Sequence, residues 1–189
     1  MLYILISFAM PMVWAVMTAL FPLFMENLRS LNPVITIVSM GFALYGFVIM
    51  RTEGLNFKKA RLAEIILIVI NLISITMNKN TSAESVIVSH GTFFVFIAIS
   101  QMAVTWYVKF LTGQAVREME RHRNVDIDGK VLEKVILIEI ALLTFGYIFL
   151  HIYAPIGLIL SILALVANAV AVYCLYKTYK LSREVPGIK

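Results

Sequence analysis

Four polar side chains lie inside long apolar stretches of this chain, where a site for a small ligand or ion could be built. They are Glu139, Gln101, Asn71 and Asn168. If each stretch is a membrane-crossing helix, these residues lie roughly 10–14 Å from the same membrane face, at ~1.5 Å per residue. Thr105 lies one turn from Gln101 and extends the polar face. The shared depth predicts either a polar cavity open to the cytoplasm or a network of mutual hydrogen bonds.

Glu139 carries the strongest functional signal, because an ionisable side chain at bilayer depth is costly and marks a site by default. A carboxylate in that setting suits a proton carrier or a cation ligand. The alternatives are a protonated carboxyl that donates to a neighbouring carbonyl, or a side chain that reaches toward the interface. For Asn71, Gln101 and Asn168, the alternative is hydrogen bonding between helices, worth about 0.6 kcal/mol per bond. Glu64 is expected at a helix start near the surface, where it favours the helix dipole.

His90 and His151 are the candidate metal ligands, since both fall near the outer ends of predicted helices. If these helices are neighbours, the two rings could meet around a metal or a haem. The simpler interpretation is an interfacial histidine at each position. No cofactor is predicted. The single cysteine, Cys174, excludes an internal disulfide and a cysteine-based zinc cluster.

Six apolar stretches must position these residues. Hydrophobic residues make up 61% of the 189-residue chain and charged residues 14%, whereas a soluble domain has roughly 25% charged residues. We therefore predict an all-α fold, a single domain over 1–189 built as a polytopic membrane bundle of six transmembrane helices. The predicted spans are 2–25, 33–50, 62–77, 86–112, 132–153 and 155–176.

The basic residues predict the orientation of the bundle. All but two of the 16 Lys and Arg residues lie in every second gap between spans, in the span ends beside these gaps, or in the C-terminal tail, the exceptions being Arg29 and Lys79. The positive-inside rule then places both termini in the cytoplasm. We expect a multi-pass protein of a prokaryotic plasma membrane. The basic residues are scattered among short loops, so the expected partner is the lipid bilayer and not nucleic acid.

Small and polar residues recur on one face of each predicted helix, and we expect these faces to point inward. They include Ser7 and Pro11, Thr36 and Ser39, Glu64 and Asn71, Gln101 and Thr105, Glu139 and Gly146, and Ala164 and Asn168. The very short connection between the last two spans requires an antiparallel hairpin.

These features favour a small transport-type protein that binds a solute, proton or cation between its helices. The alternative is a non-catalytic subunit or sensor that docks a membrane partner, or a second copy, through the helix that carries Gly41 and Gly46 and the small-residue face of the sixth span. A membrane-embedded lipid-modifying enzyme is the least favoured class, because no nucleotide-binding loop, HExxH or catalytic serine motif occurs.

Six spans, cytoplasmic termini and a small-residue spacing in the first helix, Ala15-Val-Met-Thr-Ala19, give a further indication. In size and topology the chain is similar to the substrate-binding subunits of energy-coupling vitamin importers. The resemblance implies a solute-binding bundle whose first helix offers a docking face to a partner subunit.

Overall fold

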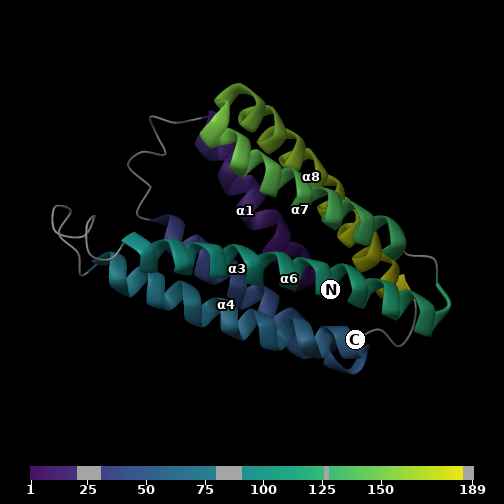
Figure 1. Ribbon diagram of the computed structural model, residues 1–189. Coiled ribbons are helices and arrows are strands. Elements are labelled where there is room, and N and C mark those ends of the chain that lie inside the picture. The colour runs from purple at the N-terminus through teal and green to yellow at the C-terminus, as the bar shows by residue number, and fades with distance from the viewer. Residues whose placement is uncertain (21–30, 80–90, 126–127, 185–189) are drawn as a thin grey trace.

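The computed structural model describes residues 1–20, 31–79, 91–125 and 128–184, and its regular elements are helices throughout these ranges. They are α1 (Leu2–Leu20), α3 (Asn32–Ile49), the short 3₁₀ helix η2 (Met50–Thr52), α4 (Leu55–Lys79), α6 (Gly91–Arg123), α7 (Gly129–Ile152) and α8 (Ala154–Glu184) (Figure 1). The predicted all-α class is confirmed. Parts of the first and fourth spans, 21–25 and 86–90, lie outside the described residues.

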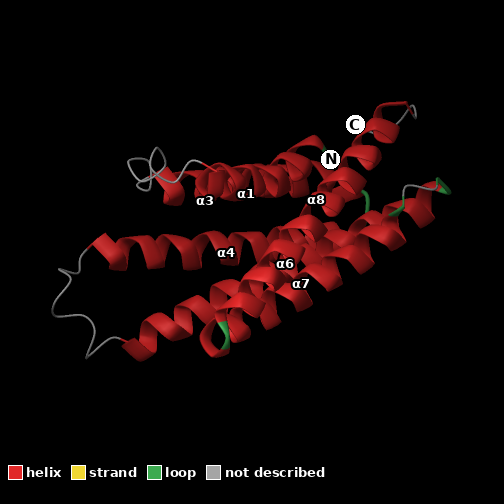
Figure 2. Ribbon diagram, turned by 90° about the horizontal axis from the view of Figure 1, so that it is seen from above, coloured by secondary structure: helices red, strands yellow, loops and turns green. Residues whose placement is uncertain are grey.

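The long helices form a closed ring in the order of the chain. Each packs on the next, and α8 packs back on α1. Figure 2 shows α1 and α3 on one side of the bundle and α4, α6 and α7 on the other. Figure 1 shows that α1, α7 and α8 diverge from α3, α4 and α6 toward one end of the bundle. The contact between α1 and α8 closes the ring and brings together residues that are at least 134 positions apart along the chain.

Local sequence explains several helix boundaries. Pro33 lies in the first turn of α3, where its missing N–H has no helical acceptor to lose. Asp128 adopts a left-handed conformation (φ 58°) directly before α7. Tyr153 is extended between α7 and α8, which confirms the predicted hairpin. Gly157 permits the close approach within this hairpin, because a Cβ there would lie only 2.5 Å from the Leu150 nitrogen.

Three helices extend beyond the predicted spans into charged sequence. Helix α4 begins at Leu55, seven residues before the predicted start, while α6 continues to Arg123 and α8 to Glu184. These extensions meet at one end of the bundle, the right side in Figure 1. We call it the charged end; it comprises residues 50–55, 117–125, 128–133 and 177–184. These helices extend beyond their apolar segments because charged residues are tolerated in a helix once it leaves lipid.

Ion pairs and a capping interaction hold the charged end together. The Arg123 guanidinium pairs with the Glu53 carboxylate at 2.6 Å, and Lys177 pairs with Asp128. The Glu118 carboxylate accepts hydrogen bonds from two backbone N–H groups at the start of α4, those of Leu55 and Asn56, at 3.2 and 3.1 Å. It therefore caps a helix from a position 63 residues away in sequence.

Within the described ranges, four helical segments are long and apolar enough to cross a membrane: Pro33–Thr52, Val95–Arg123, Gly129–Ile152 and Ala154–Leu181. In α1 the apolar segment Leu2–Met17 is shorter. In α4 the basic residues Lys58, Lys59 and Arg61 occupy the first turns, so only the part of the helix after Glu64 is predominantly apolar. Length and composition thus identify a membrane-embedded helix bundle, with α1 and α4 completing the ring.

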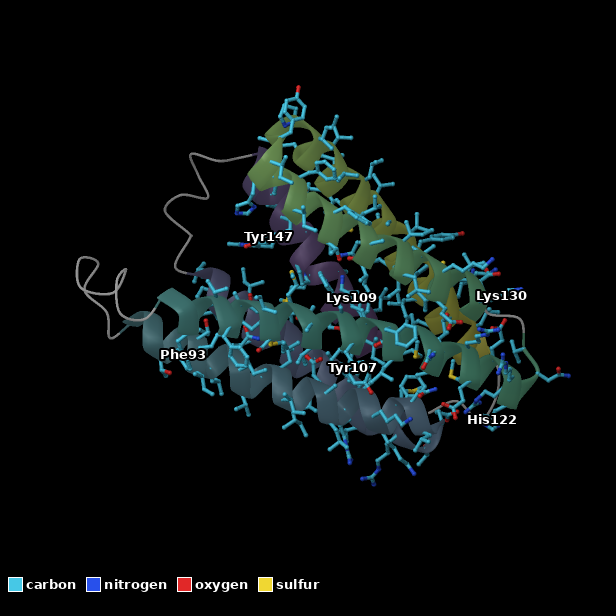
Figure 3. The ribbon with its side chains drawn as sticks, viewed as in Figure 1. Phe93, Tyr107, Lys109, His122, Lys130 and Tyr147 are labelled. Carbon is cyan, nitrogen blue, oxygen red and sulfur yellow. The ribbon has the colours of Figure 1, made fainter. Side chains whose placement is uncertain are left out.

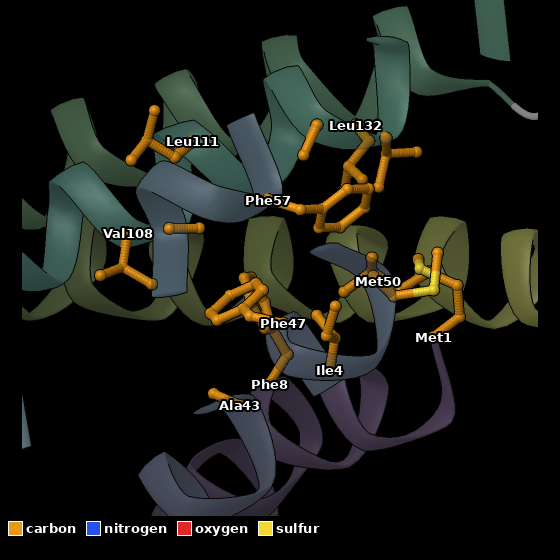
Figure 4. Packing of buried hydrophobic residues seen from close by; sticks show 14 of the residues in the cluster. Met1, Ile4, Phe8, Ala43, Phe47, Met50, Phe57, Val108, Leu111 and Leu132 are labelled. Atoms are coloured by element: carbon orange, nitrogen blue, oxygen red, sulfur yellow. The ribbon is translucent and has the colours of Figure 1, made fainter. Parts of the chain in front are cut away.

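The buried core lies beside the charged end. Phe47, Met50, Phe57 and Ile4 are almost completely buried and pack with residues from α6, α7 and α8 (Figure 4). By contrast, the outward faces of the helices expose large apolar side chains, including Phe96, which is 67% exposed. An apolar exterior of this extent fits a lipid environment.

Candidate functional site

A cavity of about 520 Å³ lies inside the ring, bounded by α1, α3, α4, α6 and α8. Its polar lining combines residues from all five helices: Ser7, Thr36, Ser39, Glu64, Asn71, Gln101, Thr105, Lys109 and Asn168. The remaining lining is apolar and includes Phe8, Phe47 and Trp106. Five of the six inward faces predicted from small and polar residues therefore meet around one space, whereas the α7 face with Glu139 and Gly146 does not line it.

Four predicted site residues come together in this cavity. The Gln101 side-chain amide donates to Asn71 Oδ1 at 2.9 Å, which joins α6 to α4. The Thr105 hydroxyl donates within its own helix, to the Gln101 carbonyl. Asn168 lines the cavity from α8, and its buried Oδ1 has no hydrogen-bond partner among the described residues. A cavity and a hydrogen-bond network, the two alternatives drawn from the sequence, thus occur together.

Glu139, the fifth candidate, lies behind the cavity wall. It is 2% exposed and forms an ion pair with Lys109, which itself lines the cavity. The Lys109 ammonium also lies 5.4 Å from the centre of the Phe8 ring, within range of a cation–π interaction. Figure 3 shows Lys109 near the middle of α6. From the sequence, Glu139 was considered as a protonated carboxyl that donates to a carbonyl or as a side chain that reaches the interface. In the structure it forms a buried ion pair instead.

Glu64 is a cavity residue whose position the sequence analysis placed wrongly. Helix α4 begins at Leu55, so Glu64 lies in its third turn and not at a helix start near the dipole. The side chain is 2% exposed and lines the cavity. No hydrogen bond or ion pair involving it occurs within the described part of the chain. The error arose because Lys58 and Lys59 were assigned to a loop, although they form the first turns of α4.

Lys109 was also missed, because it was counted among the basic residues that end a span. Helix α6 instead continues 14 residues further, about 21 Å at the usual rise. A usable signal existed in the spacing: Gln101, Thr105 and Lys109 recur every four residues and therefore share a helix face. Extending the polar face of Gln101 and Thr105 by one more helical turn would have identified Lys109 as a cavity residue.

The charges around the cavity do not cancel. Lys109 is matched by Glu139, which leaves Glu64 as the one carboxylate without a described ionic partner. When all three groups are ionised, the site carries one negative charge. A positive ligand is therefore electrostatically favoured.

The cavity is closed toward the charged end. Phe8, Phe47 and Val108 belong both to its lining and to the buried core. Pro11 and Ala98 line the cavity and have exposed side chains. The cavity is therefore open to its surroundings beside these two residues.

The candidate metal ligands remain apart from this cavity. His151 is exposed at the end of α7, where its Nδ1 lies 2.9 Å from the Tyr147 carbonyl oxygen. His90 lies outside the described residues. Within the described ranges, no cluster of three or more His, Cys, Asp or Glu side chains is arranged to hold a metal ion.

No protein-family model, curated protein or solved structure matches this chain. The chemistry of the site must therefore be inferred from its own residues. What they offer is one unpaired carboxylate, one unsatisfied amide oxygen and aromatic side chains around a space of small-molecule size.

Proposed function

We propose that the protein is a small transport-type membrane protein that binds a small solute, proton or cation in the cavity within its helix ring. The observation that carries the proposal is Glu64, a carboxylate that lines the cavity and has no partner in the described protein. A buried, uncompensated charge costs several kcal/mol. A bound cation or a proton would remove that cost, so the site is better satisfied when occupied.

The size and lining of the cavity support the same proposal. Small-molecule sites typically measure about 300–1,000 Å³ and combine apolar walls with a few convergent polar groups. The cavity, at about 520 Å³, has both properties. Ionisable residues inside membrane proteins usually line such pathways.

The charge pattern supports an outward-facing arrangement in a prokaryotic plasma membrane. If the charged end lies in the cytoplasm, as the positive-inside rule predicts, the core of Phe8, Phe47 and Val108 separates the cavity from that side. The exposed Pro11 and Ala98 then mark the external entrance. Transport would require the ring to open near the charged end and close around the opposite one.

A solute screen followed by a flux assay tests the proposal. A bound solute stabilises the folded protein by an amount that grows with its concentration above Kd. We therefore expect one or more solutes or cations to raise the Tm of the purified protein, and the same compounds to enter proteoliposomes. Pyranine trapped inside the vesicles reports proton movement in the same experiment.

Two carboxylate variants make the assay specific. Glu64→Gln should abolish the stabilisation and the flux, whereas Glu133→Gln, at the charged end and paired with Arg117, should retain both. Wild-type protein that gives neither stabilisation nor flux above empty vesicles for any solute or ion would contradict the proposal.

Docking of a membrane partner or a second copy is the second candidate, supported by small residues on the outer surface. Gly41 is exposed, and a Cβ built there meets nothing within 4 Å. Ala15 is exposed on α1. Small residues on an outer face allow another helix to approach closely. If docking occurs there, Gly41→Leu should reduce co-purification of the partner or shift the oligomer to monomer without changing solute-induced stabilisation.

A further inference from the structure

We infer that the ligand of the cavity is an organic monocation, an amine with an N–H-bearing ammonium group and an apolar body. The inference rests on the proposed solute-binding function and specifies its substrate class. Three features of the cavity carry it: the charge of Glu64, the unsatisfied Asn168 oxygen and the apolar lining.

In its ionised form, Glu64 selects for a ligand with a single positive charge. Its carboxylate is 2% exposed, and even Arg61, one turn earlier on α4, forms no ion pair with it within the described residues. One monocation neutralises this site without leaving a net charge. A divalent metal ion would need several oxygen ligands with more negative charge, and no acidic cluster of that kind occurs in the described ranges.

Lys109 shows how this interior already accommodates an ammonium group. Its charge contacts the Glu139 carboxylate and lies over the Phe8 ring at 5.4 Å. A carboxylate and aromatic side chains of the same kind, Glu64 with Phe47 and Trp106, also line the cavity. Aromatic faces attract cations most strongly when water is excluded. The cavity therefore offers an ammonium ligand the same kinds of contact, a carboxylate and aromatic rings, that the protein provides for Lys109.

The amide of Asn168 and the size of the cavity define the rest of the ligand. Asn168 Oδ1 is a buried acceptor without a described donor, so a ligand that carries N–H groups would satisfy it. A volume of about 520 Å³ far exceeds the ~30 Å³ that one water molecule occupies. A bare alkali cation would leave most of this space, including its apolar walls, filled with water. An apolar body attached to the ammonium group fills it instead.

Calorimetric titration of the purified full-length chain in nanodiscs, with empty nanodiscs as the blank, tests the inference. The probes share a phenyl ring and a two-carbon linker: 2-phenylethylammonium is the cation, 2-phenylethanol the neutral analogue and 3-phenylpropanoate the anion. We expect the ammonium to bind wild-type protein about 10–100-fold more tightly than the alcohol, because a charged hydrogen-bonded contact is gained. Glu64→Gln should remove most of this preference and leave binding of the alcohol nearly unchanged. Glu133→Gln is the matched control and should retain the preference.

The comparison of the three probes on wild-type protein needs no variant, so it remains decisive if Glu64→Gln does not fold. The cation inference would be overturned if the alcohol bound as tightly as the ammonium, if the propanoate bound more tightly than the ammonium, or if no probe bound. If the alcohol or the propanoate binds and Ala98→Trp, which fills the cavity, abolishes that binding, solute binding stands and only the substrate class is wrong. Failure of solute binding itself would appear separately, as a blank result in the broader solute screen.

Discussion

The Lys109–Glu139 ion pair should be strongly coupled, because both groups lie inside the helix ring. Their side chains are 18% and 2% exposed. Two unit charges about 4 Å apart attract by about 4 kcal/mol at an effective dielectric constant of about 20, and desolvation offsets part of this energy. Replacing Lys109 with Met leaves the Glu139 carboxylate buried and unpaired. We expect this change alone to reduce the free energy of unfolding by about 3–5 kcal/mol.

A double-mutant cycle measures the coupling. Glu139→Gln alone should cost less than Lys109→Met, because Lys109 lines the cavity and retains its contact with Phe8. The double variant should recover part of the loss, which gives a coupling energy of about 2–3 kcal/mol, near the upper limit for contacting pairs. Unfolding is followed by circular dichroism during titration of mixed micelles with SDS. The slope of the transition is compared between variants to confirm that the unfolding process is unchanged.

The Arg117–Glu133 pair provides the matched control. It lies at the charged end, with side chains 35% and 15% exposed, so solvent should screen it and lower the coupling to about 1 kcal/mol or less. Additive effects at Lys109 and Glu139, within about 0.5 kcal/mol, would refute the conclusion that these residues form a buried pair.

Three further substitutions test the packing and the charged end. Gly157→Ala places a methyl group 2.5 Å from the Leu150 nitrogen and should reduce the free energy of unfolding by about 1–3 kcal/mol; a neutral result would show that the hairpin is packed more loosely. Gly41→Ala meets no atom within 4 Å and should be neutral or stabilise α3 by up to about 1 kcal/mol; a clear loss would mean that Gly41 is covered. Glu118→Ala removes the acceptor for two N–H groups of α4 and should cost about 1–2 kcal/mol in SDS unfolding, whereas Ala at the exposed Lys59 should have little effect.

Periodicity and charge predicted much of the fold because lipid imposes strict rules. Apolar stretches gave six helices, and the shared depth of Gln101 and Asn71 anticipated a contact that the structure realises at 2.9 Å. The order of neighbours around the ring could not be predicted beyond the last hairpin. It depends on side-chain packing such as the contact of Gly46 with Ile4, which no single-helix pattern contains.

The two charged cavity residues show where hydropathy reasoning fails. Glu64 and Lys109 were treated as markers of the membrane surface because a charge ends an apolar window. In a ring with a polar interior, a charge on the inward face can lie well inside a helix that continues beyond it. Helix α4 begins nine residues before Glu64, and α6 ends 14 residues after Lys109. Each residue lines the cavity because it lies on the inward face of its helix. Its distance from the end of the apolar stretch does not determine this role.

The proposed function requires a water-accessible cavity that opens away from a cytoplasmic charged end. It is tested most directly by labelling intact cells with a membrane-impermeant maleimide, using a Cys174→Ala background. Two single cysteines are compared, Ala98→Cys in the cavity and Lys58→Cys at an exposed position on the first turn of α4. We expect the cysteine at position 98 to react from outside the cell and the cysteine at position 58 to react only after permeabilisation. Reaction at position 58 in intact cells, or protection of position 98 from the external reagent, would contradict this requirement.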